Sequence, residues 1–113
     1  INAHGTGTPL NDAAETAAIK KAMGARVKDV LVSSTKSMTG HMLGAAGAAE
    51  AIAAILALKT GVVPPTAGLH QQDPACDLDC VPVSARRAGP VLALSVSMGF
   101  GGHNVCLAFR KTG

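Results

Sequence analysis

Residues 33–50, SSTKSMTGHMLGAAGAAE, form the stretch around which the rest of the chain must be organised. It places Lys36 and His41 in a segment rich in hydroxyl groups and glycine, and this segment runs directly into an alanine-rich helix. A spacing of five residues suits neither one face of a helix nor one face of a strand, so both side chains are expected on irregular backbone. A polar loop ahead of an apolar helix is a typical place for chemistry.

The alanine-rich segment, residues 44–60, is apolar on nearly every side, which predicts a helix enclosed by protein. Glu50 is its only acid, and a buried carboxylate requires a partner or a cation. Gly61 ends the helix, and Pro64 and Pro65 prevent it from continuing. Because the chain offers few large side chains to surround this helix, we expect a further half of the protein to cover it.

The remaining pattern predicts an α/β fold. The 113 residues suffice for one domain with a core, without internal repeats or a domain boundary. Residues 66–90, rich in proline and aspartate, are expected to form a surface loop with a short edge strand at 77–83. The other expected elements are a strand end at residues 1–3, a helix at 11–23, buried strands at 29–33 and 91–95, and a last strand at 105–110.

Glu15, in the helix expected at residues 11–23, has two alternative interpretations. Asp12 is a candidate N-cap, and Glu15 follows it by three residues as in a capping box. Glu15 would otherwise be a carboxylate that orients a lysine at a site. The local pattern favours capping, and both alternatives stay open on the residues alone.

A second glycine-rich turn, HGTGTP, begins at His4 and includes Thr6 and Thr8. Its two glycines let the backbone turn tightly and approach a ligand. Two loop histidines, His4 and His41, together with Lys36, favour acid–base or oxyanion chemistry. A neutral imidazole donates a hydrogen bond to a developing oxyanion, and a nearby ammonium group favours the neutral form.

Composition and charge argue against several classes of function. Aromatic residues make up only 2% of the chain, which argues against an aromatic platform for nucleic acid. The net charge of +3 is dispersed, and no run of basic residues marks a nucleic-acid patch. No signal peptide is visible, and the apolar run at residues 45–58 is too short for a bilayer, so we expect no membrane partner.

The three cysteines indicate a reducing compartment, and hence the cytoplasm, because an odd count at irregular spacing is no disulfide framework. None resembles an activated nucleophile, which requires a helix N-terminus or a paired base. Cys76 and Cys80 lack the nearby histidine pair of a zinc site. We expect Cys106 in the core as a small hydrophobic residue, and His70 on a solvated loop.

Three motifs, HGTGTPLND, SSTKSMTGHMLGAAGAAEA and GFGGHN, together resemble the C-terminal half of β-ketoacyl-[acyl-carrier-protein] synthases of the elongating, type II kind. The resemblance covers essentially all 113 residues. It implies the C-terminal half of the thiolase-like αβαβα fold, a mixed sheet with a buried central helix, with residues 1–113 as the C-terminal ketosynthase domain. The half that bears the nucleophile would be absent from this chain, and the start at Ile1 without methionine suggests a fragment.

The same resemblance assigns roles to individual residues. His4 and His41 match the two catalytic histidines, Lys36 matches the active-site lysine, and Glu15 matches the acid that holds that lysine. Thr6 and Thr8 match threonines that hydrogen-bond the phosphopantetheine arm, and Phe100 matches a gating phenylalanine beside the acyl pocket. Residues matching those around a structural monovalent cation in some members are Asn2, Glu50 and Ser95.

The implied reaction is a decarboxylative Claisen condensation in fatty-acid or polyketide chain elongation. An acyl thioester would sit on a cysteine of the other half, and His4 and His41 would stabilise the enolate formed when malonyl-carrier protein loses CO2. No cofactor is required, since phosphopantetheine arrives on the carrier protein; a structural Na⁺ or K⁺ ion is expected as in some members. The implied partners are acyl carrier protein, the N-terminal half and a second copy in a homodimer.

Two alternatives remain open beside this enzyme. One is a non-catalytic partner subunit of the chain-length-factor kind, and the other is a thiolase-like acyltransferase that uses coenzyme A. Retention of His4, Lys36 and His41 favours the condensing enzyme over the partner subunit. The residues of the HGTGT and TKSMTGH motifs argue against the thiolase-like reaction. This chain alone is predicted to be inactive.

Overall fold

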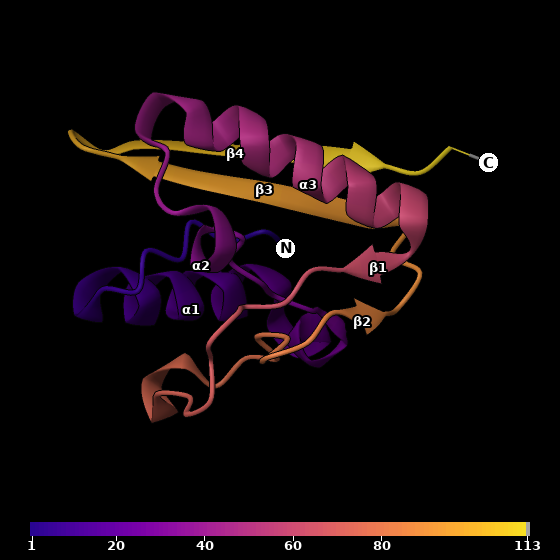
Figure 1. Cartoon of the computed structure of the whole chain (residues 1–113). Coiled ribbons are helices and arrows are strands. Elements are labelled where there is room, and N and C mark those ends of the chain that lie inside the picture. Colours follow the sequence, from indigo (N-terminus) through magenta and orange to yellow (C-terminus); the bar gives the residue numbers. More distant parts are fainter. Residues whose placement is uncertain (113) are drawn as a thin grey trace.

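The computed structural model describes residues 1–112, and two long helices flank a central sheet (Figure 1). The 3-10 turns span Gly24–Asp29, Leu43–Ala45 and Pro74–Cys76. In chain order the labelled elements are α1 (Pro9–Met23), α2 (Lys36–Thr39), α3 (Ala46–Thr60), β1 (Val62–Val63), β2 (Arg86–Arg87), β3 (Leu92–Gly99) and β4 (His103–Arg110).

The sheet is mixed and is joined partly through single bridges. Asn2 pairs in parallel with Ser33 on one side and with Ser95 of β3 on the other. Leu31 pairs in parallel with Asp79, and β3 pairs antiparallel with β4. The order across the sheet is therefore the segment at Asp79, the segment at Leu31 and Ser33, the segment at Asn2, then β3 and β4. The predicted mixed α/β sheet is confirmed.

Helices α1 and α3 pack on opposite faces of this sheet (Figure 1). The α1 side buries Ile19 against Ala3, Val32 and Leu78. The α3 side buries a second cluster, made of Ala54, Leu58 and Ala93 with Phe109 packed against it. Full burial of one such aliphatic side chain stabilises a fold by about 1.5–3 kcal/mol, so these two clusters hold the helices in register with the strand ends.

Helix α3 matches the helix predicted for residues 44–60, with a 3-10 turn as its first residues. Gly61 ends it in the left-handed region at φ 73°, and its N–H bonds to the Ala57 carbonyl. One face of α3 lies against the sheet, whereas Ile52, Ile55 and Leu56 remain about half exposed. Within this chain the central helix is therefore enclosed on one side only.

The segment Leu43–Thr60 is 18 residues long and apolar enough to cross a membrane by length and composition, which corrects the sequence-based statement that this run is too short. Such a helix is weak evidence for a membrane span, because core helices pass the same test. Glu50 lies in its middle and forms an ion pair with Lys36, and Ala54 and Leu58 pack on the sheet. These contacts indicate a core helix of a globular domain.

The start of α1 corrects the capping prediction. The helix begins at Pro9, with Thr8 as the N-cap residue, so Asp12 lies inside the first turn. Proline is favoured at this position because its fixed φ suits the helix and its missing N–H would have no helical partner. Asp12 accepts a hydrogen bond from the Gly7 N–H at 3.2 Å, and Glu15 is free to bind elsewhere.

The strands predicted at residues 29–33 and 77–83 are wrong, because each segment forms only isolated bridges. A 3-10 turn runs to Asp29, and only single bridges at Leu31 and Ser33 follow. In the second segment, Val81 and Val83 have φ of 46° and 65°, and extended backbone does not tolerate such values. Only isolated bridges, including one at Asp79, remain there.

The last two strands are longer than predicted and form a hairpin. Residues 97–104, which lie between the two predicted strands, mostly belong to β3 and β4, and the connection is only Phe100 to Gly102. Gly101 and Gly102 have φ of 80° and 81°, values that only glycine adopts readily. Cys106 of β4 is exposed in this chain, so its predicted place in the core is wrong.

Candidate active site

His4 lies just beyond the sheet segment at Asn2, where the chain turns through Gly5. Glu15 of α1 holds this turn: Oε1 accepts the His4 N–H and Oε2 accepts the Gly5 N–H, each at 2.8 Å. The Glu15 side chain is buried, so these charge-assisted bonds are made away from water. Glu15 therefore positions the backbone that carries His4.

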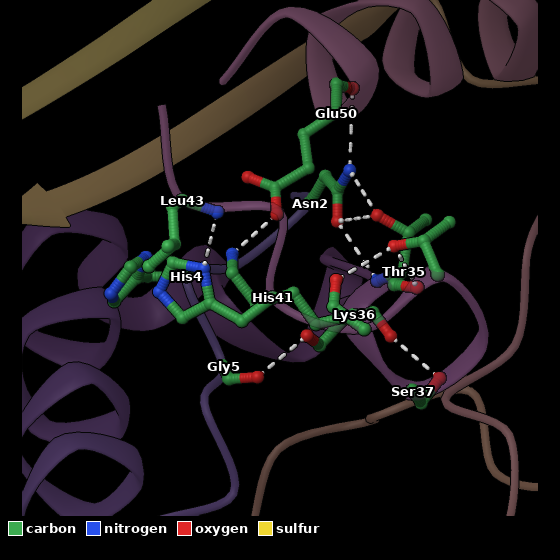
Figure 2. Close-up of polar contacts among 12 residues, drawn as sticks. Asn2, His4, Gly5, Thr35, Lys36, Ser37, His41, Leu43 and Glu50 are labelled. Carbon is green, nitrogen blue, oxygen red and sulfur yellow. Dashed lines mark hydrogen bonds and ion pairs between the residues drawn. The ribbon is translucent and has the colours of Figure 1, made fainter. Parts of the chain in front are cut away.

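Lys36 begins α2 and reaches across to α3. Its Nζ forms an ion pair with Glu50 Oε1, and the two side chains are only 5% and 3% exposed (Figure 2). The structure thus corrects the assignment of Glu15 as the acid that holds this lysine. Each charge of the pair supplies the compensation that the other needs for burial.

The imidazoles of His4 and His41 lie edge to face, with ring centroids 5.5 Å apart and planes at 87°. His41 Nδ1 accepts the Leu43 N–H at 3.2 Å (Figure 2). In a neutral ring one nitrogen accepts and the other carries the proton, so this bond assigns the His41 proton to Nε2. His41 is exposed in this chain and His4 is buried.

His4 is held in its neutral form. Desolvation by burial lowers its pKa from the usual value of 6.5, and the Lys36 ammonium lowers it further. Its Nδ1 is buried and has no hydrogen-bond partner among the described residues. A buried neutral imidazole with an unpartnered nitrogen is suited to meet a polar atom of a substrate.

Asn2 contacts both Glu50 and Ser95, and Glu50 is the partner of Lys36. Asn2 Nδ2 donates to the Glu50 backbone oxygen at 3.3 Å, and Asn2 pairs with Ser95 through the backbone. Asn2 Oδ1 accepts the Thr35 N–H at 3.3 Å (Figure 2). Glu50 Oε2 is buried and has no partner among the described residues. Within residues 1–112 no group of three His, Cys, Asp or Glu residues could hold a metal ion.

Of the three residues predicted to contact substrate, Thr6 and Thr8 lie near His4, whereas Phe100 lies apart from them. Thr6 and Thr8 lie in the same turn as His4, with their hydroxyl oxygens 3.0 Å apart. Phe100 lies at the hairpin tip and is fully exposed. This chain therefore places Thr6 and Thr8 in the turn that follows His4 and leaves Phe100 without a surface to gate.

Residues 1–70 match the family described as "Beta-ketoacyl synthase, C-terminal domain". The chain belongs to the β-ketoacyl synthase family. Among curated relatives, 3-oxoacyl-[acyl-carrier-protein] synthase 2 of Synechocystis sp. (strain ATCC 27184 / PCC 6803 / Kazusa) is 57% identical over 111 residues, covering 98% of this chain. Nodulation protein E of Rhizobium sp. (strain N33) is 51% identical over 111 residues. The ketosynthase chain spans 27% and 28% of the length of these two relatives.

Solved ketosynthases share the fold. The structure entitled "The ishigamide ketosynthase/chain length factor" has a TM-score of 0.93 at 41% identity, covering 99% of this chain and 27% of that one. A type II polyketide synthase complex, AntDE:AntF, of a ketosynthase with its acyl-carrier protein, has a TM-score of 0.94 at 38% identity, covering 98% and 27%. These likenesses confirm the predicted C-terminal half of the thiolase-like fold.

Sequence reasoning missed several residues of this β-ketoacyl synthase site. Thr35 donates to Asn2 through both its N–H and its hydroxyl, each at 3.3 Å. Ser34 donates its hydroxyl to the Gly5 carbonyl at 2.7 Å. The available signal was the run of hydroxyl residues from Ser33 to Thr35, directly ahead of the lysine.

Proposed function

We propose that the protein to which this chain belongs is a 3-oxoacyl-[acyl-carrier-protein] synthase, an acyltransferase that extends an acyl thioester by decarboxylative condensation with malonyl-carrier protein. The observation that carries the proposal is the meeting of His4 and His41, at 5.5 Å, beside the buried ion pair of Lys36 and Glu50. Two imidazoles and an ammonium group from separate turns favour negative charge on one substrate oxygen.

His4, Lys36 and His41 each have a separate role in stabilising the enolate. His41 donates from Nε2, because its Nδ1 is occupied by the Leu43 N–H. His4 stays neutral through its lowered pKa and donates a second hydrogen bond to the same oxygen. Lys36 keeps the site electropositive while Glu50 keeps its ammonium group in place. Donors fixed before the reaction need no reorganisation when charge develops, which is the source of their effect on rate.

The carrier protein is the proposed source of malonyl and acyl groups. A similar ketosynthase was solved in complex with its acyl-carrier protein. Thr6 and Thr8 lie next to His4 with exposed hydroxyl groups, where they would bond the phosphopantetheine arm that the carrier protein brings. The N-terminal half supplies the cysteine nucleophile and the surface facing Phe100, and the complete protein forms a homodimer in the cytoplasm.

Relatives named 3-oxoacyl-[acyl-carrier-protein] synthase 2 favour fatty-acid elongation over polyketide assembly. The likeness to a ketosynthase/chain length factor structure keeps a non-catalytic partner subunit as a second candidate. The retained Lys36, His4 and His41 favour the condensing enzyme, because a subunit that only shapes a pocket has no chemical use for a preorganised oxyanion site.

The test compares the full-length protein with the chain of residues 1–113 alone. Each is mixed with acyl-carrier protein and radiolabelled malonyl-carrier protein, and labelled 3-ketoacyl product is measured. We expect product from the full-length protein and none from the chain alone, because residues 1–112 place no activated cysteine beside the two histidines. The same mixture with coenzyme A thioesters replacing carrier-protein thioesters is the control for a thiolase-like reaction.

Robust product from residues 1–113 would contradict the division into two halves. A full-length protein that makes no product but raises product formation by a separate ketosynthase would instead be a partner subunit.

We also propose a structural Na⁺ or K⁺ ion near Asn2, Glu50 and Ser95. Glu50 Oε2 is a buried carboxylate oxygen without a partner among the described residues, and oxygen donors of this kind are preferred by hard cations. Asn2 Oδ1 already accepts from Thr35, so Glu50 is the ligand that supports the ion most directly.

Replacing Na⁺ and K⁺ by choline at constant ionic strength is expected to lower the midpoint of thermal unfolding of the full-length protein. An ion at a hundred times its Kd stabilises the folded state by about 2.7 kcal/mol, which removal would forfeit. Calorimetry in the three chloride salts measures the effect, and equal midpoints in all three would rule the ion out.

A further inference from the structure

The two turns that carry the site diverge from a common pair of sheet segments. The Ala3 N–H donates to the Ser33 carbonyl at 2.8 Å, and this is the last backbone hydrogen bond between the two segments before they separate. One segment continues into the turn with His4, and the other continues towards Lys36. Side-chain bonds between Asn2 and Thr35 also join the two segments, and the Ser34 hydroxyl reaches further along the first one, to the Gly5 carbonyl of the His4 turn at 2.7 Å.

Ser34 is itself fixed from other directions. Its N–H donates to Thr66 Oγ1 at 3.2 Å, and its carbonyl accepts the Ser37 hydroxyl at 2.7 Å. Thr66 Oγ1 donates in turn to the Cys80 carbonyl at 2.7 Å. The hydroxyl of Ser34 therefore projects from an anchored backbone, so its bond constrains the position of Gly5.

The contact between the turns is also tight. A Cβ atom at Gly5 would lie 2.6 Å from Ser34 Cβ and 2.7 Å from Ser34 Oγ, closer than real side chains approach. Gly5 has φ of 39°, and Ser34 is only 8% exposed. Close approach of these two residues brings the His4 turn against the turn that leads to Lys36.

We propose that Ser34 is a positioning residue for the condensation. Its hydroxyl sets the distance of His4 from Lys36 and His41. The inference rests on the proposed function. His4 is held from α1 through Glu15, whereas Lys36 is held from α3, on the opposite face of the sheet. The hydrogen bond from Ser34 to Gly5 joins the His4 turn to the segment that leads to Lys36. It therefore fixes the two turns relative to each other, so that both imidazoles reach one oxygen.

Two substitutions of Ser34 distinguish the effect of its hydroxyl group from the effect of its side-chain volume. Ser34 lines a cavity of about 420 Å³ on the α1 side, together with Gly5, Ser37 and Thr66. We expect the extra methyl group of Ser34→Thr to enter this space, and the variant retains the donor. Ser34→Ala removes the donor and leaves the volume nearly unchanged.

The experiment uses the full-length protein and measures kcat and KM for malonyl-carrier protein, together with transfer of the acyl group onto the enzyme. We expect Ser34→Ala to lower kcat for condensation about tenfold, because loss of the hydrogen bond that holds Gly5 lets the donors move slightly, and a net hydrogen bond is worth at most about tenfold. KM and acyl transfer onto the enzyme should change less than twofold, since neither needs two imidazoles on one oxygen. Ser34→Thr should restore kcat to within threefold.

Thr60→Val is the control, because it also removes a hydroxyl group that donates to a backbone carbonyl. Thr60 Oγ1 donates to the Leu56 carbonyl at 2.8 Å and accepts the Val62 N–H at 3.3 Å, so its bonds lie at the C-terminal end of α3 and do not reach Ser34 or the His4 turn. We expect this variant to lower the thermal midpoint while kcat stays within twofold of the unaltered protein.

Several outcomes would overturn the inference. These are a Ser34→Ala kcat within twofold of the unaltered protein, or an equal loss of kcat in Thr60→Val. If Ser34→Ala does not fold, a folded Ser34→Thr with a tenfold loss would contradict the role of the hydroxyl. An unaltered protein without condensation activity would overturn the proposed function itself, which distinguishes that failure from the failure of Ser34 alone.

Discussion

Replacing His4 by alanine in the full-length protein is expected to slow the release of CO2 from malonyl-carrier protein by about 10²- to 10³-fold. This is the loss seen when one preorganised donor is removed from an oxyanion site. His4 contributes a neutral imidazole, because desolvation and the Lys36 ammonium both lower its pKa. Labelled CO2 released from malonyl-carrier protein in a single turnover measures the effect.

His70→Ala is the control for this experiment. It makes the same substitution at an exposed histidine of the outer loop, where the described structure gives the ring no contact with the site. Release of CO2 should be unchanged in this variant. If His4→Ala also released CO2 at the original rate, His4 would have no part in holding the enolate.

The two long helices could be predicted because their signals are local. The apolar run that becomes α3 ends at Gly61, and the glycine has the left-handed conformation that such a position requires. The strands at residues 31–33 and 79 could not be predicted at their observed length. They pair through single bridges, and bridges depend on which segments the fold brings together and not on local propensity.

The roles of the two acids show where sequence reasoning reaches its limit. Glu15 was assigned to a cap or to the lysine, whereas it accepts two backbone N–H groups ten and eleven residues away. Glu50 was assigned to a cation, and its Oε1 pairs with Lys36, fourteen residues away. No local pattern encodes either contact, because both join residues at least ten positions apart in the sequence. That Glu50 needs a partner could be predicted from its apolar surroundings, but the identity of the partner could not.

Replacing Glu50 by leucine is expected to destabilise the full-length protein by about 3–5 kcal/mol, because it leaves the buried Lys36 ammonium without a counter-charge. The side chains of the pair are only 5% and 3% exposed, so water cannot replace the missing carboxylate. Urea denaturation measures the loss. The control is Lys20→Leu, which breaks the exposed pair of Lys20 with Asp77 and should leave the unfolding midpoint unchanged.

The double variant Lys36→Met/Glu50→Leu tests whether the ion pair is needed for stability or for condensation. Well-packed apolar side chains often replace a buried ion pair without loss of stability, so the double variant should unfold near the midpoint of the original protein. Condensation should nevertheless be lost, because the site would no longer hold a positive charge beside His4. Stability without activity would mean that the ion pair serves the reaction, since the fold does not need it. A double variant as unstable as Glu50→Leu alone would contradict this, and would assign the pair a structural role at the junction of α2 and α3.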